Sequence, residues 1–255
     1  MIANYHTHTT RCGHAVGQDR AYIETAIARG LHTLGFSEHV PMPFPDGHES
    51  GYRVPMRLLD DYVTSILALR EEYRGRIEIK LGFEAEYYPD LFPAMLDRLS
   101  RYPVDYLLLA QHFVDSRELV YNTNPQTSED ALSLYVDRCL DGMRTGKFTY
   151  LAHPDLFYFM GRPKIYRQEM TRLCLGAKEL GVPLEINLLG LREHRNYPCP
   201  LFWEIAGELG CPAVLGCDAH SPDVVADPEN LKEADDFAAR FGVVPMTDVR
   251  LVKPF

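Results

Sequence analysis

Short apolar runs recur along the whole chain, and most of them end on a histidine or an acidic residue. Examples are LHTLGFSEH (31–39), IEIKLGFE (77–84) and VDYLLLAQH (104–112). Buried parallel strands have this composition, because helices cover both faces of their sheet. Four further runs have the same character: 2–6, 148–153, 182–190 and 211–220. The pattern therefore predicts seven parallel strands, most of which deliver a polar side chain at the carboxyl end.

Amphipathic segments separate these runs. The expected helices are 21–30, 57–73, 89–102, 128–146, 167–181, 200–210 and 230–242. Strands that alternate with helices through short connections fit one closed or nearly closed parallel barrel. An open doubly wound sheet is the alternative, but such a sheet builds its site from only a few strand ends. No repeat, low-complexity segment or linker divides the chain, so residues 1–255 are expected to form a single α/β domain.

The strand ends carry residue types that bind metals. In a barrel the carboxyl ends of all strands meet at one mouth, so these side chains are expected to converge there. His6 and His8 are two residues apart and share one face of the first strand. A single histidine in such a place is more often structural, but the joint occurrence predicts a metal site. The expected ligands are His6, His8, His14, His39, Glu84, His112, His153, Asp218 and His220.

Composition narrows the range of partners. The formal net charge is -10 and no basic cluster interrupts it, which argues against nucleic acid and anionic membranes. No apolar run approaches the roughly 20 residues of a membrane helix, and the first residues lack the features of a secretory signal. The six cysteines form no CxxC pair, which favours reduced thiols in the cytoplasm. Cys12 and Cys217 lie beside expected ligands, but packing is the usual role of a buried cysteine.

The make-up of the ligand set indicates a class of substrate. Nine donors are too many for one zinc or iron ion and suit three ions that share bridging carboxylates and water. Only Glu84 and Asp218 are acidic, so three divalent ions would leave about four positive charges in the cavity. A cationic cavity suits a dianionic phosphate better than a neutral amide. The choice among zinc, iron and manganese stays open, as does the choice between a monomer and a small homo-oligomer.

Six short motifs are spread over almost the whole chain: HTH (6–8), SEH (37–39), GFEAEY (82–87), QHF (111–113), AHPD (152–155) and CDAH (217–220). With them the chain resembles the PHP (polymerase and histidinol phosphatase) family of metal-dependent phosphoesterases. The resemblance implies a distorted (β/α)7 TIM-like barrel and a trinuclear site with all nine ligand positions filled. The segments 6–15, 57–63 and 186–192 are most similar to the stand-alone histidinol-phosphate phosphatases. One departure is Ala110, where that subgroup often has serine.

The resemblance also implies a mechanism. A water molecule between the metal ions would provide hydroxide at neutral pH and attack phosphorus in line. Asp218, His220 and Arg192 are the expected catalytic residues. Arg192 is also expected to hold the phosphate, with Arg162 as the second candidate. Histidinol phosphate carries an amine and an imidazole, which call for a carboxylate and flat apolar walls. The remaining expected substrate contacts lie in loops after the strands or in the long loop 41–55: Glu86, Asp155 and His48.

Other functions remain open at this point. A phosphoesterase of the same family could act on another small phosphate ester or a nucleotide. An amidohydrolase-like metal hydrolase can also begin with HxH, but its dinuclear type often has a carboxylated lysine on strand 4, where this chain has Gln111-His112. The metals could instead stabilise a non-catalytic module, although the complete ligand set speaks against this. The expected partner is a small phosphorylated metabolite, with neither nucleic acid nor membrane.

Overall fold

Two parallel sheets lie at the centre of the protein, and the computed structural model describes all 255 residues around them. The larger sheet has the strand order β1-β2-β3-β4, and the smaller sheet pairs β5 with β6. The strands are β1 (Ala3–Asn4), β2 (Thr33–His39), β3 (Glu78–Ala85), β4 (Tyr106–Leu109), β5 (Leu184–Asn187) and β6 (Ala213–Gly216). Every residue of β2 is buried, as expected of a strand that is covered on both faces.

Isolated bridges join the two sheets into a ring. Leu151 pairs with Leu109 of β4 and with Leu184 of β5, so residues 149–152 lie between the two sheets. On the other side, Thr7 just after β1 pairs with Ala219 just after β6. The predicted distorted (β/α)7 barrel is therefore confirmed. The distortion is largest at 149–152, where the expected strand makes only a one-residue bridge to each neighbour.

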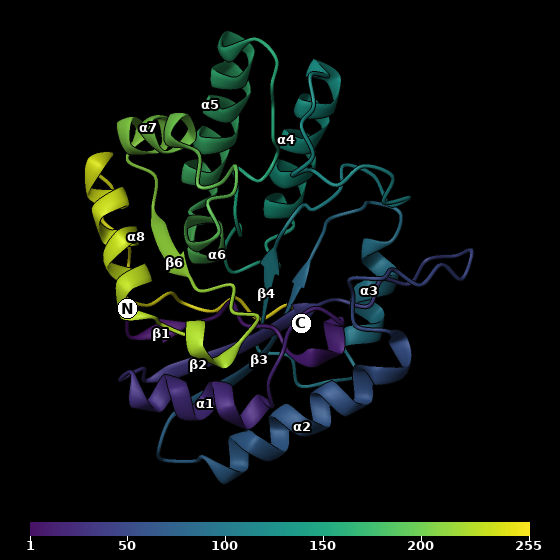
Figure 1. Cartoon of the computed structure of the whole chain (residues 1–255). Coiled ribbons are helices and arrows are strands. Elements are labelled where there is room, and N and C mark those ends of the chain that lie inside the picture. Colours follow the sequence, from purple (N-terminus) through teal and green to yellow (C-terminus); the bar gives the residue numbers. More distant parts are fainter.

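Helices surround this ring (Figure 1). They are α1 (Asp19–Ala28), α2 (Leu59–Glu72), α3 (Phe92–Leu99), α4 (Glu129–Arg144), α5 (Pro163–Leu180), α6 (Leu188–Arg192), α7 (Pro200–Leu209) and α8 (Pro228–Arg240). Helices α1 and α2 lie on one side of the strands, and α4, α5 and α7 lie on the opposite side. Each of the expected helices is present. None of them has the length and apolar character that a membrane crossing requires.

Helix α6 was not expected from the sequence. The apolar run 182–190 was predicted to continue as a strand, but β5 ends at Asn187. The Asn187 side chain accepts a hydrogen bond from Gly190 N at 3.0 Å and caps the new helix. Leu188 and Leu189 are buried in α6, so their apolar character is satisfied without a strand. As a result, Arg192 lies in the last turn of a helix rather than in a loop.

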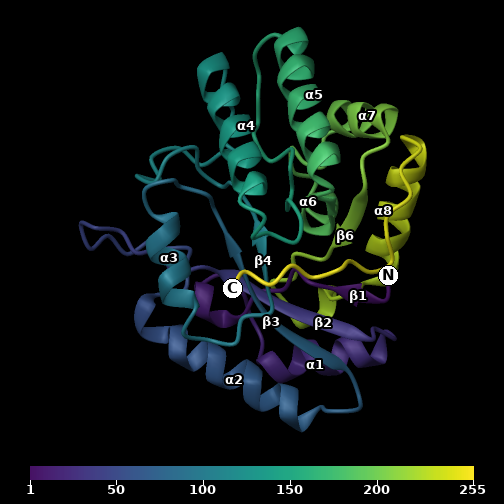
Figure 2. The same cartoon turned by 180° about the vertical axis from the view of Figure 1, so that it is seen from behind.

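The C-terminal tail closes the barrel at the end where the strands begin. Met246 N donates to Ala213 O at 2.8 Å and Ile2 N donates to Thr247 O at 3.3 Å, so the tail enters between β6 and β1. Figure 2 shows it running from α8 to the C-terminus across the near side of the strands. Its residues Val249 and Leu251 pack on a small apolar cluster that includes Tyr5. The open mouth is therefore at the opposite end, where the strands finish.

Candidate metal centre

Glu84, near the end of β3, lies in the middle of a group of imidazoles. Its Oε1 is 2.8 Å from His153 Nε2, 3.3 Å from His6 Nε2 and 3.4 Å from His112 Nε2. The Glu84 residue is only 1% exposed. A carboxylate without solvent is stable only when several positive or donor groups face it, and the strand ends provide them from three other segments of the barrel.

The second oxygen of Glu84 faces the histidines of the neighbouring strands. Its Oε2 is 2.9 Å from His39 Nδ1 and 3.5 Å from His8 Nε2. The register of the sheet explains the first of these contacts, because His39 and Glu84 are direct partners in the β2–β3 ladder. One carboxylate thus faces histidines from both sides, which is the arrangement of a bridging ligand.

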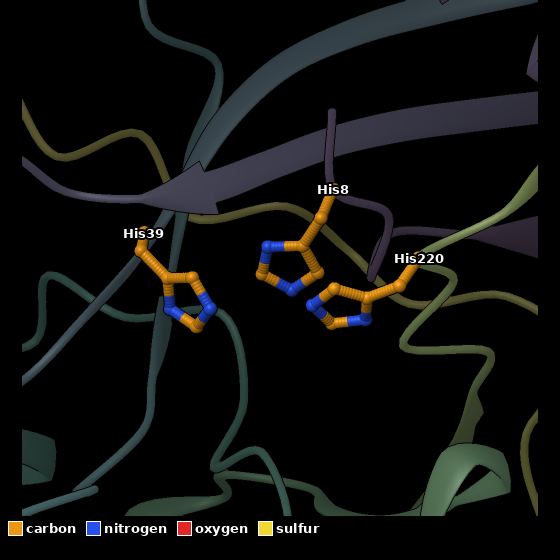
Figure 3. A group of neighbouring side chains, drawn as sticks. All are labelled: His8, His39 and His220. Carbon is orange, nitrogen blue, oxygen red and sulfur yellow. The ribbon is translucent and has the colours of Figure 1, made fainter. Parts of the chain in front are cut away.

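Asp218 is the second acidic residue of the cluster. Its Oδ1 is 3.2 Å from His8 Nε2, 3.4 Å from His220 Nδ1 and 3.5 Å from His6 Nε2. The rings of His8, His39 and His220 approach one another from three separate segments (Figure 3). His14 completes this side, since its ring stacks on that of His220 with 4.8 Å between the centroids. The structure therefore brings all nine predicted ligand residues to one place.

Two of these residues have a backbone conformation that side chains usually avoid. His153 has φ 29° and Asp218 has φ 45°, both in the left-handed region. Non-glycine residues adopt this region at a cost of about 1–3 kcal/mol, and such residues are common at functional sites. The chain turns sharply at both positions, directly after a barrel segment, and the turn directs each side chain into the cluster.

The charges in the cluster set the protonation states that metal binding needs. Burial alone would raise the pKa of Glu84, but the charge of His112 and of other imidazoles holds it well below its usual range. The pKa of Asp218 is lowered against burial in the same way. Burial lowers the pKa of His39 well below its usual value and that of His220 to about 4. Ionised carboxylates and neutral imidazoles, such as those of His39 and His220, are donors that divalent transition metals prefer. The carboxylates that face His6 and His112 raise the pKa of these two imidazoles against burial, so both must lose a proton when metal binds.

Unpartnered atoms show that these residues fit metal ions. The buried atoms without a hydrogen-bond partner include His6 Nε2, His8 Nε2, His153 Nδ1 and His220 Nε2. A buried polar atom left in this state costs about 1–3 kcal/mol unless it binds something. Sets of three donors lie within 4.8 Å of one another, including His8–His39–His220 and His6–His153–Asp218. The donor types and their spacing fit ions shared between adjacent sets.

Cys12 lies close to this cluster, and Cys217 directly precedes Asp218. Cys12 Sγ is within 4.8 Å of donor atoms of His14 and His220, but it donates to Thr9 O at 3.2 Å. Burial raises the pKa of both the Cys12 and the Cys217 thiol to about 12. Both side chains are thus packed as neutral thiols, in keeping with the packing role expected for them.

Two buried carboxylates hold ligand histidines from behind. Glu185 Oε1 is 2.7 Å from His6 Nδ1, and Glu86 Oε1 is 2.8 Å from His112 Nδ1. Such contacts fix the ring orientation and leave the other nitrogen free for a metal. Glu185 was missed by the sequence analysis. Its signal was present, because an acidic residue inside the apolar strand LEIN must have a buried partner.

The cluster lies at the bottom of a cavity of about 390 Å³. The cavity walls contain residues that the sequence analysis did not select: Tyr121, Leu189, Glu193, Arg195 and Tyr197. Arg195 is held in place by Glu193, at 2.7 and 2.9 Å, and donates from Nη1 to Tyr197 OH at 3.0 Å. An arginine beside a metal cluster provides planar donors for an oxyanion.

Three predicted substrate contacts lie outside this cavity. Arg192 is on α6 and does not line the cavity. Arg162 has a side chain that is 72% exposed and pairs with Glu129. The His48 side chain is 45% exposed and is 3.5 Å from Glu118. This geometry does not support the phosphate-binding role predicted for Arg192 and Arg162. The prediction rested on their positions in loops after strands, and such a position does not determine the direction of the side chain.

Glu86 and Asp155 have partners within the protein. Glu86 is held by His112, and it also accepts hydrogen bonds from Arg53 Nη1 and Tyr52 OH, both at 2.5 Å. Asp155 Oδ2 accepts from Cys199 N at 2.5 Å. Asp155 does line a separate aromatic cavity of about 190 Å³, together with residues 157–159. Neither carboxylate lines the metal cavity.

Comparison with known proteins places this geometry in a family. The PHP domain matches residues 4–188. A probable histidinol-phosphatase of Deinococcus radiodurans is 30% identical over 234 residues, which cover 88% of each chain. The histidinol-phosphatase of Bacillus subtilis is 27% identical over 250 residues, covering 84% of this chain and 92% of that one. Among solved structures, one match is the histidinol phosphate phosphatase of Lactococcus lactis in complex with zinc, L-histidinol and phosphate. It has a TM-score of 0.73 at 20% identity, and the match covers 98% of this chain and 97% of the Lactococcus chain.

Proposed function

The chain belongs to the PHP domain family, and from this premise we propose that it is a metal-dependent phosphomonoesterase that hydrolyses L-histidinol phosphate to L-histidinol and phosphate. The observation that carries the proposal is the convergence of two ionised carboxylates and several imidazoles at the bottom of one cavity, beside an arginine. This set suits a phosphate dianion, and the relatives from Deinococcus radiodurans and Bacillus subtilis bear the names probable histidinol-phosphatase and histidinol-phosphatase.

Three divalent transition-metal ions are the proposed cofactors. Glu84 and Asp218 would each hold more than one ion, because each faces histidines on more than one side. The remaining ligands are the seven histidines of the cluster: His6, His8, His14, His39, His112, His153 and His220. Divalent ions in such a site lower the pKa of coordinated water and neutralise phosphate charge. Zinc, iron and manganese all accept this donor set.

Arg195 is the residue that we now assign to the phosphate. It lines the metal cavity, and Glu193 and Tyr197 hold its guanidinium in place. A fixed guanidinium offers two parallel N–H donors to phosphate oxygens without further loss of side-chain freedom. Its charge also faces the negative charge that develops as the phosphoryl group is transferred.

The walls of the cavity suit the histidinol end of the substrate. Tyr121 and Tyr197 provide flat aromatic surfaces for the imidazole, and the Glu193 carboxylate is available to the amine. Asp155 lies in the neighbouring aromatic cavity and stays a candidate for the far end of a longer substrate. A cytoplasmic location and a monomer or small homo-oligomer remain predictions.

The decisive experiment measures activity and metal content on the same purified sample. Initial rates are compared for L-histidinol phosphate, a nucleoside monophosphate, a sugar phosphate and p-nitrophenyl phosphate. We expect two or more metal ions per chain and a kcat/KM for histidinol phosphate at least about a hundredfold higher than for the others, or about 2.7 kcal/mol of transition-state binding. If the metal-loaded protein prefers another ester, the proposed phosphatase activity stands, but histidinol phosphate is refuted as its substrate. A metal-free, inactive protein would reject both.

A further inference from the structure

The carboxylate behind His112 is held by a buried arginine from the long segment between β2 and α2. Arg53 donates from Nη1 to Glu86 Oε2 at 2.5 Å, while Glu86 Oε1 lies 2.8 Å from His112 Nδ1. Glu86 and Arg53 are 1% and 3% exposed. A buried ion pair contributes little net stability, because desolvation of the two charges offsets their attraction. A gain in fold stability therefore does not explain the pair, and the contact of Glu86 with His112 Nδ1 points to a role in holding that ring.

Arg53 also joins two loops at the rim of the barrel. Its Nε donates to Glu118 Oε1 at 2.8 Å, in the segment that follows β4. One guanidinium thus contacts the end of β3 through Glu86 and the next loop through Glu118. Arg53 Nη2 is buried and has no partner, so the group is fixed by two carboxylates rather than by solvent.

The residues on either side of Arg53 contact the cluster as well. Tyr52 OH donates to Glu86 Oε1 at 2.5 Å, and the Tyr52 ring lies edge-on to His39 with 5.1 Å between centroids. Val54 N donates to His39 O at 3.2 Å. Residues 52–54 therefore contact His39 directly, and they contact His112 both through Glu86 and through the Tyr52 ring, with 5.6 Å between the ring centroids. The position of this segment and the positions of two ligand rings depend on each other.

We propose that Arg53 and Glu86 are positioning residues: Arg53 fixes Glu86, Glu86 fixes the ring of His112 for metal binding, and bound metal in turn holds residues 52–54 against the cluster. Coupling of this kind is reciprocal, so the free energy that the ordered segment adds to metal binding equals the free energy that bound metal adds to ordering the segment. The inference rests on the metal centre of the proposed function and is independent of the identity of the phosphate ester.

The test compares the wild type with Arg53→Met, Glu86→Gln and the control Arg167→Met. Arg167 is an exposed residue of α5 that pairs with Glu204. Metal content is measured first, and the release of each ion to a coloured chelator is then followed in time. We expect one ion to leave about 10–100 times faster from Arg53→Met and Glu86→Gln, the usual effect of losing an outer-sphere partner. The other ions, and all ions of Arg167→Met, should leave at wild-type rates.

Hydrogen exchange of the backbone amides in residues 40–55 gives the second readout. Exchange should rise in metal-loaded Arg53→Met, and in the wild type only after the metal has been stripped. Equal release from all folded variants, or an equal acceleration of every ion, would overturn the positioning role. If Arg53→Met does not fold, Glu86→Gln decides alone, because its amide keeps the volume of the carboxylate. A wild type without metal would overturn the proposed function as well, so the two failures are distinguishable.

Discussion

The histidines of the candidate metal centre are oriented by specific neighbouring side chains. His6 and His112 both have a carboxylate on Nδ1, so their Nε2 atoms face the interior of the cluster. This detail decides which nitrogen can bind a metal. The sequence predicted the ligands, because each one ends an apolar run, but it did not reveal Glu185, which lies inside such a run, or Arg195, which lies beyond a helix that was not expected.

Replacement of Asp218 by asparagine tests the bridging role. The change keeps the shape of the side chain but removes the negative charge that faces His8, His6 and His220. Turnover and metal affinity should fall by more than about a hundredfold, because the loss of an outer-sphere partner alone costs about 10–100-fold and Asp218 is proposed to bind the metal itself. Circular dichroism should show an intact fold. Asp223→Asn, at an exposed position nearby, is the matched control, and wild-type turnover in a folded Asp218→Asn protein would refute the role.

The two nearby arginines give a second test at this scale. Arg195→Ala should lower kcat/KM for histidinol phosphate by about 1.5–3 kcal/mol, the value of hydrogen bonds to a charged group. Inhibition by inorganic phosphate should weaken in parallel, while metal content stays the same. Arg192→Ala should change these quantities far less, because that side chain does not line the cavity and only approaches Glu193, with its Nη2 4.0 Å from Oε1. The reverse result would restore the original assignment to Arg192.

At the scale of elements, close packing between strands positions the ligands. Tyr106 of β4 lies against Gly35 of β2 and Gly82 of β3, and its single O–H lies within hydrogen-bond distance of two carbonyls, Tyr5 O at 2.7 Å and Phe36 O at 3.0 Å. The tyrosine thus links four neighbouring strands inside the barrel. The sequence indicated which segments are strands, but it gave no sign that these two glycines leave room for an aromatic ring.

Addition of a single methyl group at Gly82 tests this packing. A Cβ there would overlap the ring of Tyr106, and Tyr106 is fully buried. Overpacking of a core of this density costs about 1–3 kcal/mol, so Gly82→Ala should lower the free energy of unfolding in denaturant by that amount. Gly51→Ala is the control, because no atom lies within 4 Å of a Cβ at that position. Equal stability of the two variants would contradict the packing argument.

Element boundaries were harder to predict where tertiary contacts override the local pattern. Residues 148–153 have the composition of a strand, yet only Leu151 forms bridges. The turn at His153, with its positive φ, ends the segment early and directs the ring toward Glu84. Similarly, the cap provided by Asn187 converts an apolar run into a helix. In both places the departure from the expected element lies next to the metal centre.

At the scale of the whole molecule, the two halves of the barrel meet at the metal centre. Thr7 and Ala219 form a bridge there, although more than two hundred positions separate them in the sequence. The bridge is short, and the ligands on either side of it, His6 and His8 on one and Asp218 and His220 on the other, converge on the same cluster. Metal ions bound between these ligands would therefore also stabilise the closed barrel.

Metal removal should consequently lower the stability of the entire protein. Each ion held at a free concentration of a hundred times its Kd adds about 2.7 kcal/mol to the folded state, which for a chain of this size corresponds to a Tm change of roughly 5–11 °C. Treatment with a strong chelator should reduce Tm by at least this amount, and added zinc or manganese should restore it. Glu84→Gln, which lacks the central bridging charge, should start at a low Tm and respond little to the chelator. A wild-type protein that contains no metal and keeps its Tm in chelator would show that the ring closes without metal, through the Thr7–Ala219 bridge and the C-terminal tail.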